Sequence, residues 1–199
     1  MGASKAWLDF GGEPLLTRVV RTLLPEFREV IVVGRSGQEL PDCGALRVND
    51  DPERAGPLVG IAAGLAAITT ETAWITACDS PFPCLPLIRR LFDLQGSAIV
   101  VVPRWAGRLQ PLHAGYRRCS LAAADELLRH GVVKPMALLD RVACRIVEPA
   151  EFLDLDPDGL SFLNTNTEAD YRLAIAALTS GQQRQSRCPP TDEATSPSR

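Results

Sequence analysis

Two aspartates each close a predicted strand of the sequence. Asp50 ends the segment 46–50, and Asp79 ends the segment 74–79. Ligands of open α/β sheets bind outside the carboxyl ends of the strands, so we expect both carboxylates to point toward one site. Mg²⁺ is usually held by one or two carboxylates together with substrate phosphates. Either aspartate alone is explained as the start of a turn, but the two together favour a cation site.

A lysine and two asparagines are further candidates for ligand contact. Lys5 follows the small residues Gly2, Ala3 and Ser4, and a lysine in such a loop can pair with a phosphate as a point charge. A solvated surface lysine is the plainer alternative. Asn164 and Asn166 precede a predicted helix that Thr167 can cap. Capping explains Thr167 but leaves both asparagines without a structural role.

Two other features point less clearly to chemistry. Gly56 and Pro57 open a predicted helix, whose free N–H groups could face an anion, although a plain turn explains them equally well. His113 and His130 are isolated, and the spacing indicates no serine or cysteine partner. The sequence therefore offers little support for a nucleophilic triad.

The elements that must position these side chains alternate between strand and helix. Runs of consecutive apolar residues are typical of strands buried on both faces, which favours a parallel sheet covered by helices. Helical periodicity separates these runs. The sequence thus predicts an α/β protein. Strands are expected at 30–33, 46–50, 73–78, 98–102, 109–116 and 144–147, and helices at 14–24, 57–66, 85–94, 121–129, 134–142 and 167–178.

Length and composition limit the possible functions. The chain has 199 residues, of which 46% are apolar and 23% charged, and this suits one globular domain. We expect that domain to span 1–179 and a disordered polar tail to span 180–199.

The net charge of −3 argues against a protein that coats nucleic acid. No run is long and apolar enough to cross a membrane, so we expect a cytoplasmic protein. The six cysteines contain no C-x-x-C pair, which argues against a zinc site.

A series of short motifs follows one order along the chain. The motifs are Met1-Gly2-x-x-Lys5, Gly11-Gly12-x-Pro14-Leu15-Leu16, Val48-x-Asp50, Gly56-Pro57-Leu58-x-Gly60-Ile61, Cys78-Asp79-x-Pro81-Phe82, Val102-Pro103, Gly107-Arg108-x-x-Pro111-Leu112 and Asn164-x-Asn166-Thr167. This series resembles the molybdenum cofactor guanylyltransferase family. The resemblance spans almost all of residues 1–178, and an ordered series is far more specific than any one motif.

The resemblance implies a Rossmann-like nucleotidyltransferase fold with three α/β/α layers, a mostly parallel sheet and helices on both faces. It implies transfer of GMP from GTP to molybdenum-bound molybdopterin, with Mg²⁺ as cofactor and release of pyrophosphate. Lys5 and Asp79 would be catalytic and contact the nucleotide, Asp50 would lie in the nucleotide site, and Asp79 would ligate the metal. Asn164 and Asn166 would face the pterin. Molybdoenzyme apoproteins or their chaperones would be further partners.

The chain departs from the family pattern at its beginning. Family members have a strand and a Leu-Ala-Gly-Gly loop ahead of the segment that corresponds to Met1-Gly2, and we expect that strand to be central in the sheet. Many members have proline at the position of Glu168, and a glutamate there suits the first turn of a helix.

Three alternatives stay open: a cytidylyltransferase for the same cofactor, another small-molecule nucleotidyltransferase, and a truncated, non-catalytic molybdopterin-binding relative.

Overall fold

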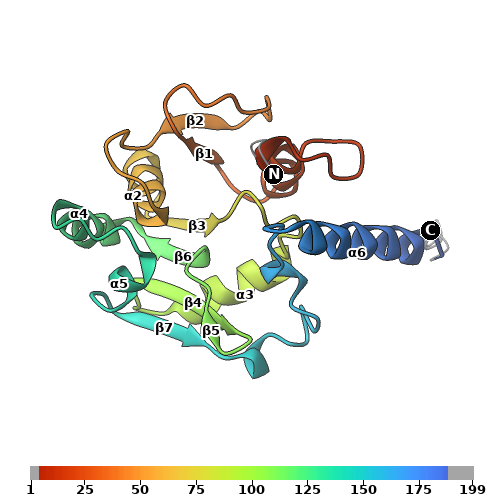
Figure 1. Cartoon of the computed structure of the whole chain (residues 1–199). Coiled ribbons are helices and arrows are strands. Elements are labelled where there is room, and N and C mark those ends of the chain that lie inside the picture. Colours follow the sequence, from red (N-terminus) through yellow and green to blue (C-terminus); the bar gives the residue numbers. More distant parts are fainter. Residues whose placement is uncertain (1–4, 188–199) are drawn as a thin grey trace, which may run out of the picture.

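The computed structural model of the chain describes residues 5–187, which form two β-sheets with helices around them (Figure 1). In the smaller sheet, β1 (Ile31–Gly34) and β2 (Leu46–Asn49) are parallel. The larger sheet has five strands, and β4 lies at its centre with β5, β6 and β7 as partners. These strands are β3 (Thr72–Thr76), β4 (Val100–Trp105), β5 (Arg108–Leu109), β6 (His113–Arg117) and β7 (Cys144–Val147).

Helices cover both faces of the larger sheet. Val100 and Val102 of β4 pack in one apolar cluster with α2 (Pro57–Ala67), α4 (Leu121–Arg129) and α5 (Pro135–Leu139). Val101, between them, belongs to a second cluster with α3 (Leu85–Gln95). Successive side chains of a strand point to opposite faces, so this alternation places the two groups of helices on opposite sides. The three α/β/α layers expected from the sequence are therefore present.

The predicted α/β fold class is confirmed, and the sheet is mixed rather than mostly parallel. The pairs β1–β2 and β4–β7 are parallel, whereas β6 is antiparallel to both β3 and β4. Residues 106–107 alone separate β4 from β5. A parallel neighbour needs a crossover of a dozen or more residues, so this short link returns the chain in the opposite direction, and both β5 and β6 run antiparallel to β4. Residues 110–112 interrupt the predicted single strand 109–116, which is split between β5 and β6.

Two helices lie near the chain ends. α1 (Leu15–Leu23) begins directly after Pro14 and buries an apolar stripe, as its periodicity predicts. α6 (Glu168–Arg187) begins at the predicted capping sequence but continues past residue 179. The segment 181–187 is rich in glutamine and arginine, both good helix formers, which accounts for this continuation. The rest of the predicted tail, 188–199, lies outside the described residues.

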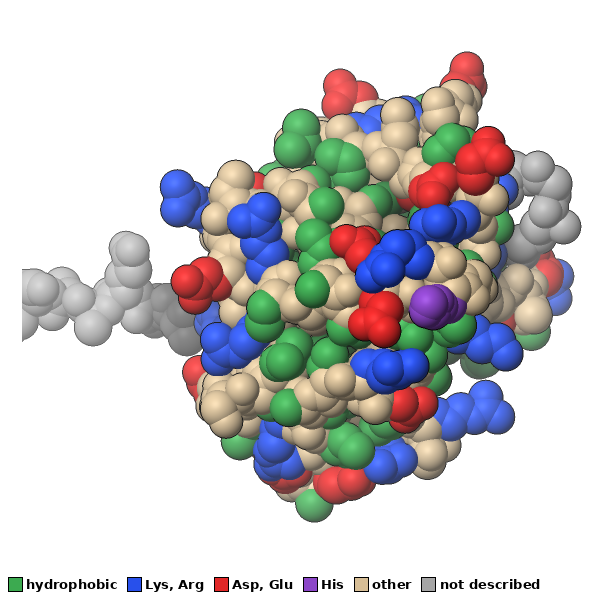
Figure 2. All heavy atoms as spheres, turned by 90° about the vertical axis from the view of Figure 1, so that its left-hand side faces the viewer, with side chains coloured by type: hydrophobic (Ala, Val, Ile, Leu, Met, Phe, Trp, Pro, Cys, Tyr) green, Lys and Arg blue, Asp and Glu red, His purple; other side chains and the backbone are tan. Residues whose placement is uncertain are grey.

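The surface carries charges of both signs. On the face that Figure 2 shows, acidic and basic side chains are interspersed with apolar ones, and neither sign gathers into one large patch. That face therefore lacks the basic stripe that binds nucleic acid backbones. Within residues 5–187, no helix is long and apolar enough to span a membrane.

Candidate functional site

Lys5 and Asp79 form an ion pair where the chain leaves β3. Lys5 Nζ donates to Asp79 Oδ2 at 2.8 Å, and 35% of the lysine side chain and 15% of the aspartate side chain are exposed. Lys5 Nζ also donates to Asn166 Oδ1. The structure thus brings together three of the predicted site residues, which come from three distant parts of the sequence.

A backbone link holds the asparagine segment against the end of β3. The carbonyl of Asp79 accepts hydrogen bonds from the Thr165 N–H at 2.9 Å and from Thr165 Oγ1 at 3.2 Å. Thr165 is fully buried. Two residues later Thr167 caps α6: Asp170 N–H donates to Thr167 Oγ1 at 3.1 Å, and Thr167 N–H donates to Asp170 Oδ2 at 2.8 Å. The cap fixes where the helix begins, and the Thr165 link fixes the asparagines beside Asp79.

Behind Asp79, a buried chain of hydrogen bonds joins β3, β6 and Asn164. Ser80 Oγ donates to Asn164 Oδ1 at 2.6 Å, and lies 3.1 Å from His113 Nε2. Since the hydroxyl gives its one proton to the amide oxygen, Nε2 of the neutral ring must carry the proton donated to Ser80. His113 Nδ1 is then the acceptor for Thr76 Oγ1, 3.4 Å away. Each hydrogen bond of this series is therefore donated in the direction from β3 toward Asn164.

Burial sets the charge of His113. It lowers the pKa of the imidazole to about 4, although a hydrogen bond with Asn164 and the charge of Asp79 act in the opposite direction. The ring is therefore neutral at physiological pH, as the hydrogen-bond chain requires.

Spacing along the sequence did not reveal the Ser80–His113 pair, because 33 residues and a change of strand separate the two. The one available signal was that Ser80 directly follows Asp79. The pair is not a catalytic dyad. Ser80 is 1% exposed and its proton is directed to Asn164, while the ring's other nitrogen faces Thr76 instead of a carboxylate.

Asp50 lies apart from these contacts, just beyond β2. Its N–H donates to the Gly34 carbonyl at 2.9 Å and extends the β1–β2 pairing. Its Oδ1 is buried and has no hydrogen-bond partner among the described residues. A buried carboxylate oxygen without a donor is costly and is characteristic of sites that complete their bonding with a ligand or ion.

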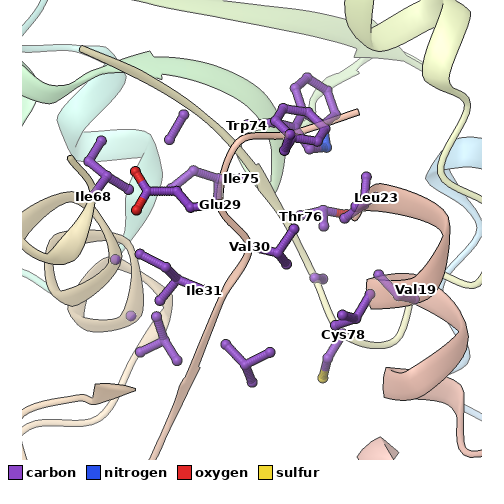
Figure 3. Close-up of a pocket in the computed structure, with 18 of the residues that line it drawn as sticks. Val19, Leu23, Glu29, Val30, Ile31, Ile68, Trp74, Ile75, Thr76 and Cys78 are labelled. Carbon is purple, nitrogen blue, oxygen red and sulfur yellow. The ribbon is translucent and has the colours of Figure 1, made fainter. Parts of the chain in front are cut away.

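A groove of about 630 Å³ separates β1 from β3 and reaches Asp79. Figure 3 shows Val30 and Ile31 on one strand of the groove, with Trp74, Ile75 and Thr76 on the other. Val19 and Leu23 line it from α1, and Ile68 lines it from the end of α2. Asp79 lines the groove, whereas Asp50, which follows β2, is not among its lining residues.

The start of α2 has a structural explanation. Gly56 has φ +154°, and a Cβ there would lie 2.6 Å from Val133 Cβ and 2.9 Å from the Val133 carbonyl oxygen. That carbonyl accepts the N–H of Leu58 at 3.1 Å. Val133 thus fills the space beside Gly56 and takes up the N–H of Leu58, which favours a plain turn over an anion site at the start of α2.

The described residues hold no dense cluster of side chains that commonly bind metals. No cluster of three or more histidine, cysteine, aspartate or glutamate side chains that could hold an ion is present in residues 5–187. The cysteines that the structure describes are free thiols, in agreement with the absence of a C-x-x-C pair. Cys188 lies outside this range.

Comparisons with known proteins give one consistent answer. Residues 1–143 match the family model of the MobA-like NTP transferase domain. A molybdenum cofactor guanylyltransferase of Desulfosudis oleivorans is 29% identical over 182 residues, which cover 91% of this chain and 90% of that protein. A probable molybdenum cofactor guanylyltransferase of Pelotomaculum thermopropionicum is 33% identical over 170 residues, which cover 85% and 83%.

Solved structures share the fold at lower identity. Molybdopterin-guanine dinucleotide biosynthesis protein A from Archaeoglobus fulgidus superposes with a TM-score of 0.77 at 21% identity, covering 90% of this chain and 92% of that one. The 2-C-methyl-D-erythritol 4-phosphate cytidylyltransferase of Thermus thermophilus gives 0.67 at 20% identity, covering 88% and 94%. The match over residues 1–143 and the two named relatives show that the chain belongs to the MobA-like NTP transferase family, as a nucleotidyltransferase of molybdenum cofactor biosynthesis.

Proposed function

We propose that this protein transfers GMP from GTP to the phosphate of molybdenum-bound molybdopterin and releases pyrophosphate. The observation that carries the proposal is the contact of Lys5 with both Asp79 and Asn166 at the carboxyl end of β3. Relatives that cover most of this chain are named molybdenum cofactor guanylyltransferases, which supports GTP as the nucleotide.

In this reaction a phosphate oxygen of molybdopterin attacks the α-phosphorus of GTP. A new P–O bond forms, the bond from the α-phosphorus to the bridging oxygen breaks, and pyrophosphate takes the electron pair. The attacking phosphate is already ionised, so no side chain has to remove a proton. The main requirement is to stabilise the negative charge that develops on the α-phosphate and the leaving group. Lys5 supplies a positive charge for this purpose, and Asp79 and Asn166 hold its ammonium group in place.

Nucleotidyltransferases of this kind typically need a divalent metal, and the carboxylates of this chain suit one. Mg²⁺ takes oxygen ligands and is commonly bound by one or two carboxylates plus substrate phosphates. Asp79 is the proposed protein ligand, and Asp50, which follows β2, has a buried Oδ1 without a partner among the described residues and is a second candidate acceptor. When bound, Mg²⁺ would neutralise charge on the nucleotide phosphates.

The asparagines are proposed to face the pterin. Asn166 is exposed and in contact with Lys5, while Ser80 holds Asn164 from the buried side. A segment anchored in this way can present polar groups to a pterin at little cost in conformational entropy. Molybdoenzyme apoproteins or their chaperones, as recipients of the product, remain a prediction from the family resemblance.

In the direct test, the purified protein is incubated with GTP, Mg²⁺ and molybdenum-bound molybdopterin. Formation of the guanine dinucleotide cofactor is followed by mass spectrometry, and pyrophosphate is measured in parallel. Replacement of GTP by CTP tests the base. Equal amounts of guanylated product and pyrophosphate, with little product from CTP, would support the proposal. A preference for CTP, or no nucleotide transfer with either substrate, would refute it.

A further inference from the structure

The register of the larger sheet places a buried histidine beside a threonine. Thr76, the last residue of β3, lies directly opposite His113, the first residue of β6. Opposed residues of an antiparallel pair project from the same face of the sheet, and Thr76 Oγ1 lies 3.4 Å from His113 Nδ1. The ring of Phe162 packs nearly perpendicular to the imidazole, with 5.7 Å between the ring centres. These contacts hold the ring of His113 in one orientation.

The position of the proton on this ring determines the direction of the whole hydrogen-bond series. One nitrogen of a neutral imidazole donates and the other accepts. With the proton on Nε2, Ser80 accepts from His113 and gives its own proton to Asn164. With the proton on Nδ1, every direction reverses, and Ser80 would accept from the amide nitrogen of Asn164. The atom that lies 2.6 Å from Ser80 Oγ is Asn164 Oδ1, which agrees with the proton on Nε2.

This direction decides which atom of Asn164 is left for a ligand. The oxygen and nitrogen of a carboxamide diverge from one carbon, so an oxygen held by Ser80 turns the nitrogen away from Ser80. Asn164 is half-buried, and its nitrogen is not among the buried atoms that lack a partner. Within residues 5–187 this nitrogen donates to no other group. Its two N–H groups can therefore donate to a ligand.

Asn166 has the same orientation for a different reason. Its Oδ1 accepts from Lys5 Nζ, and an ammonium group has donors only. Asn166 is exposed, so its amide nitrogen is also left for a ligand. The two asparagines thus both offer N–H groups, and the Lys5 ammonium lies next to one of them. Such a site suits a ligand rich in hydrogen-bond acceptors, which describes both the phosphate oxygens and the pterin ring of molybdopterin.

We propose that His113 is a positioning residue for the second substrate: it donates to Ser80, and Ser80 holds Asn164 Oδ1 on the buried side, so that the Asn164 amide donates to an acceptor atom of molybdopterin. The inference rests on the proposed function, which makes molybdopterin the second substrate. His113 is 4% exposed and Ser80 is 1% exposed, so both act through Asn164.

The first measurement is the binding of metal-free molybdopterin, titrated into the protein by anaerobic calorimetry without GTP. Ser80→Ala and His113→Leu should each raise the dissociation constant about tenfold, because each breaks the series that orients one hydrogen bond to the ligand. His113→Gln keeps an N–H donor toward Ser80 and should recover most of the affinity. Ser120→Ala is the matched control: Ser120 is also fully buried, and it donates to the carbonyl of Arg117 at the other end of β6.

Kinetics separate positioning from a merely structural role. In the transfer assay, the KM for molybdopterin should rise in Ser80→Ala and His113→Leu, while the KM for GTP should stay unchanged. A smaller folded fraction would instead lower the rate without a change in either KM. Circular dichroism of each variant checks that it is folded.

Nitrogen NMR of isotope-labelled protein follows the atoms themselves. The imidazole signals should show the proton of His113 on Nε2, and metal-free molybdopterin should shift the side-chain amide signals of Asn164. Inorganic phosphate is the second probe. A shift with both probes would assign the acceptor to the phosphate group, and a shift with molybdopterin alone would assign it to the pterin.

Equal affinity for molybdopterin in folded Ser80→Ala and in the unsubstituted protein would overturn the inference. A proton on Nδ1 of His113 would also overturn it, as would affinity that His113→Leu loses and His113→Gln does not recover. If guanylated product forms while the variants bind molybdopterin normally, only the positioning role is refuted. If the variants lose affinity as expected but no GMP is transferred, the proposed function is refuted and the positioning role stands.

Discussion

Lys5 Nζ lies 2.8 Å from Asp79 Oδ2, although 74 positions separate the two residues in the sequence. The contact joins the first described turn of the chain to the end of β3. Asn166 completes it from a third segment. A lysine between a carboxylate and an amide oxygen is held in one position before any phosphate arrives, which is the preorganisation that electrostatic catalysis requires.

Asp79→Asn should abolish metal-dependent turnover and leave the fold intact. The substitution removes the charge proposed to bind Mg²⁺, whereas the backbone carbonyl that holds Thr165 is unchanged. We expect kcat/KM for GTP to fall by roughly 10²-fold or more, with an unaltered circular dichroism spectrum. Asp93→Asn, on the exposed face of α3, is the control and should keep full activity. Near-normal turnover of Asp79→Asn would remove this residue from the metal site.

Lys5→Ala should weaken the reaction much more than it weakens the fold. The pair with Asp79 is partly exposed, and exposed ion pairs contribute about 0–1 kcal/mol to stability. The loss of a charged hydrogen bond to a phosphate corresponds to roughly 10–100-fold in kcat/KM. Steady-state kinetics and thermal melts measure the two effects. Lys5→Arg retains the charge and should recover part of the activity; a large fall in melting temperature with unchanged kinetics would contradict the proposed role.

Asp50→Ala should stabilise the ligand-free protein and impair nucleotide binding. The buried Oδ1 of Asp50 has no partner in the described structure, and an unsatisfied buried polar atom costs about 1–3 kcal/mol. Its removal should raise the free energy of unfolding by about 1 kcal/mol in urea titrations. Calorimetry with Mg²⁺ and GTP should show weaker binding than in the unsubstituted protein. If the variant binds Mg²⁺ and GTP equally well or more tightly, Asp50 is not part of the nucleotide site.

Protonation of His113 should destabilise the protein below neutral pH. Burial lowers the pKa of His113 from its ordinary value of 6.5 to about 4, so between these values the unfolded chain binds the proton and the folded chain does not. Stability is then complete above pH 6.5 and declines as the pH falls toward 4, by roughly 3 kcal/mol in total.

The histidine contribution is isolated by comparison with His113→Gln. Urea unfolding at intervals between pH 6.5 and 4.5 should show a steeper loss of stability in the unsubstituted protein than in this variant. Glu13, Glu29, Glu151 and Asp170, whose pKa values the fold lowers, are common to both proteins and cancel in the difference. Identical slopes would mean that folding leaves the pKa of His113 unchanged, which would contradict the prediction.

Local patterns in the sequence determined most of the elements. Consecutive apolar residues predicted the buried strands, and 3.6-residue periodicity together with Pro14, Pro57 and Thr167 predicted where three of the helices begin. These predictions succeed because burial on two faces, proline geometry and capping each act over a few neighbouring residues. The same locality explains why Asp50 and Asp79 could be recognised as strand-end carboxylates.

The tertiary structure decided which of these residues meet. It paired Lys5 with Asp79 and Asn166, placed the buried Ser80–His113 pair behind them, and left Asp50 apart from these contacts, just beyond β2. It also set β6 antiparallel and filled the start of α2 with the Val133 carbonyl. Such contacts depend on how sheets and helices pack across tens of residues, and no pattern of neighbouring side chains encodes them.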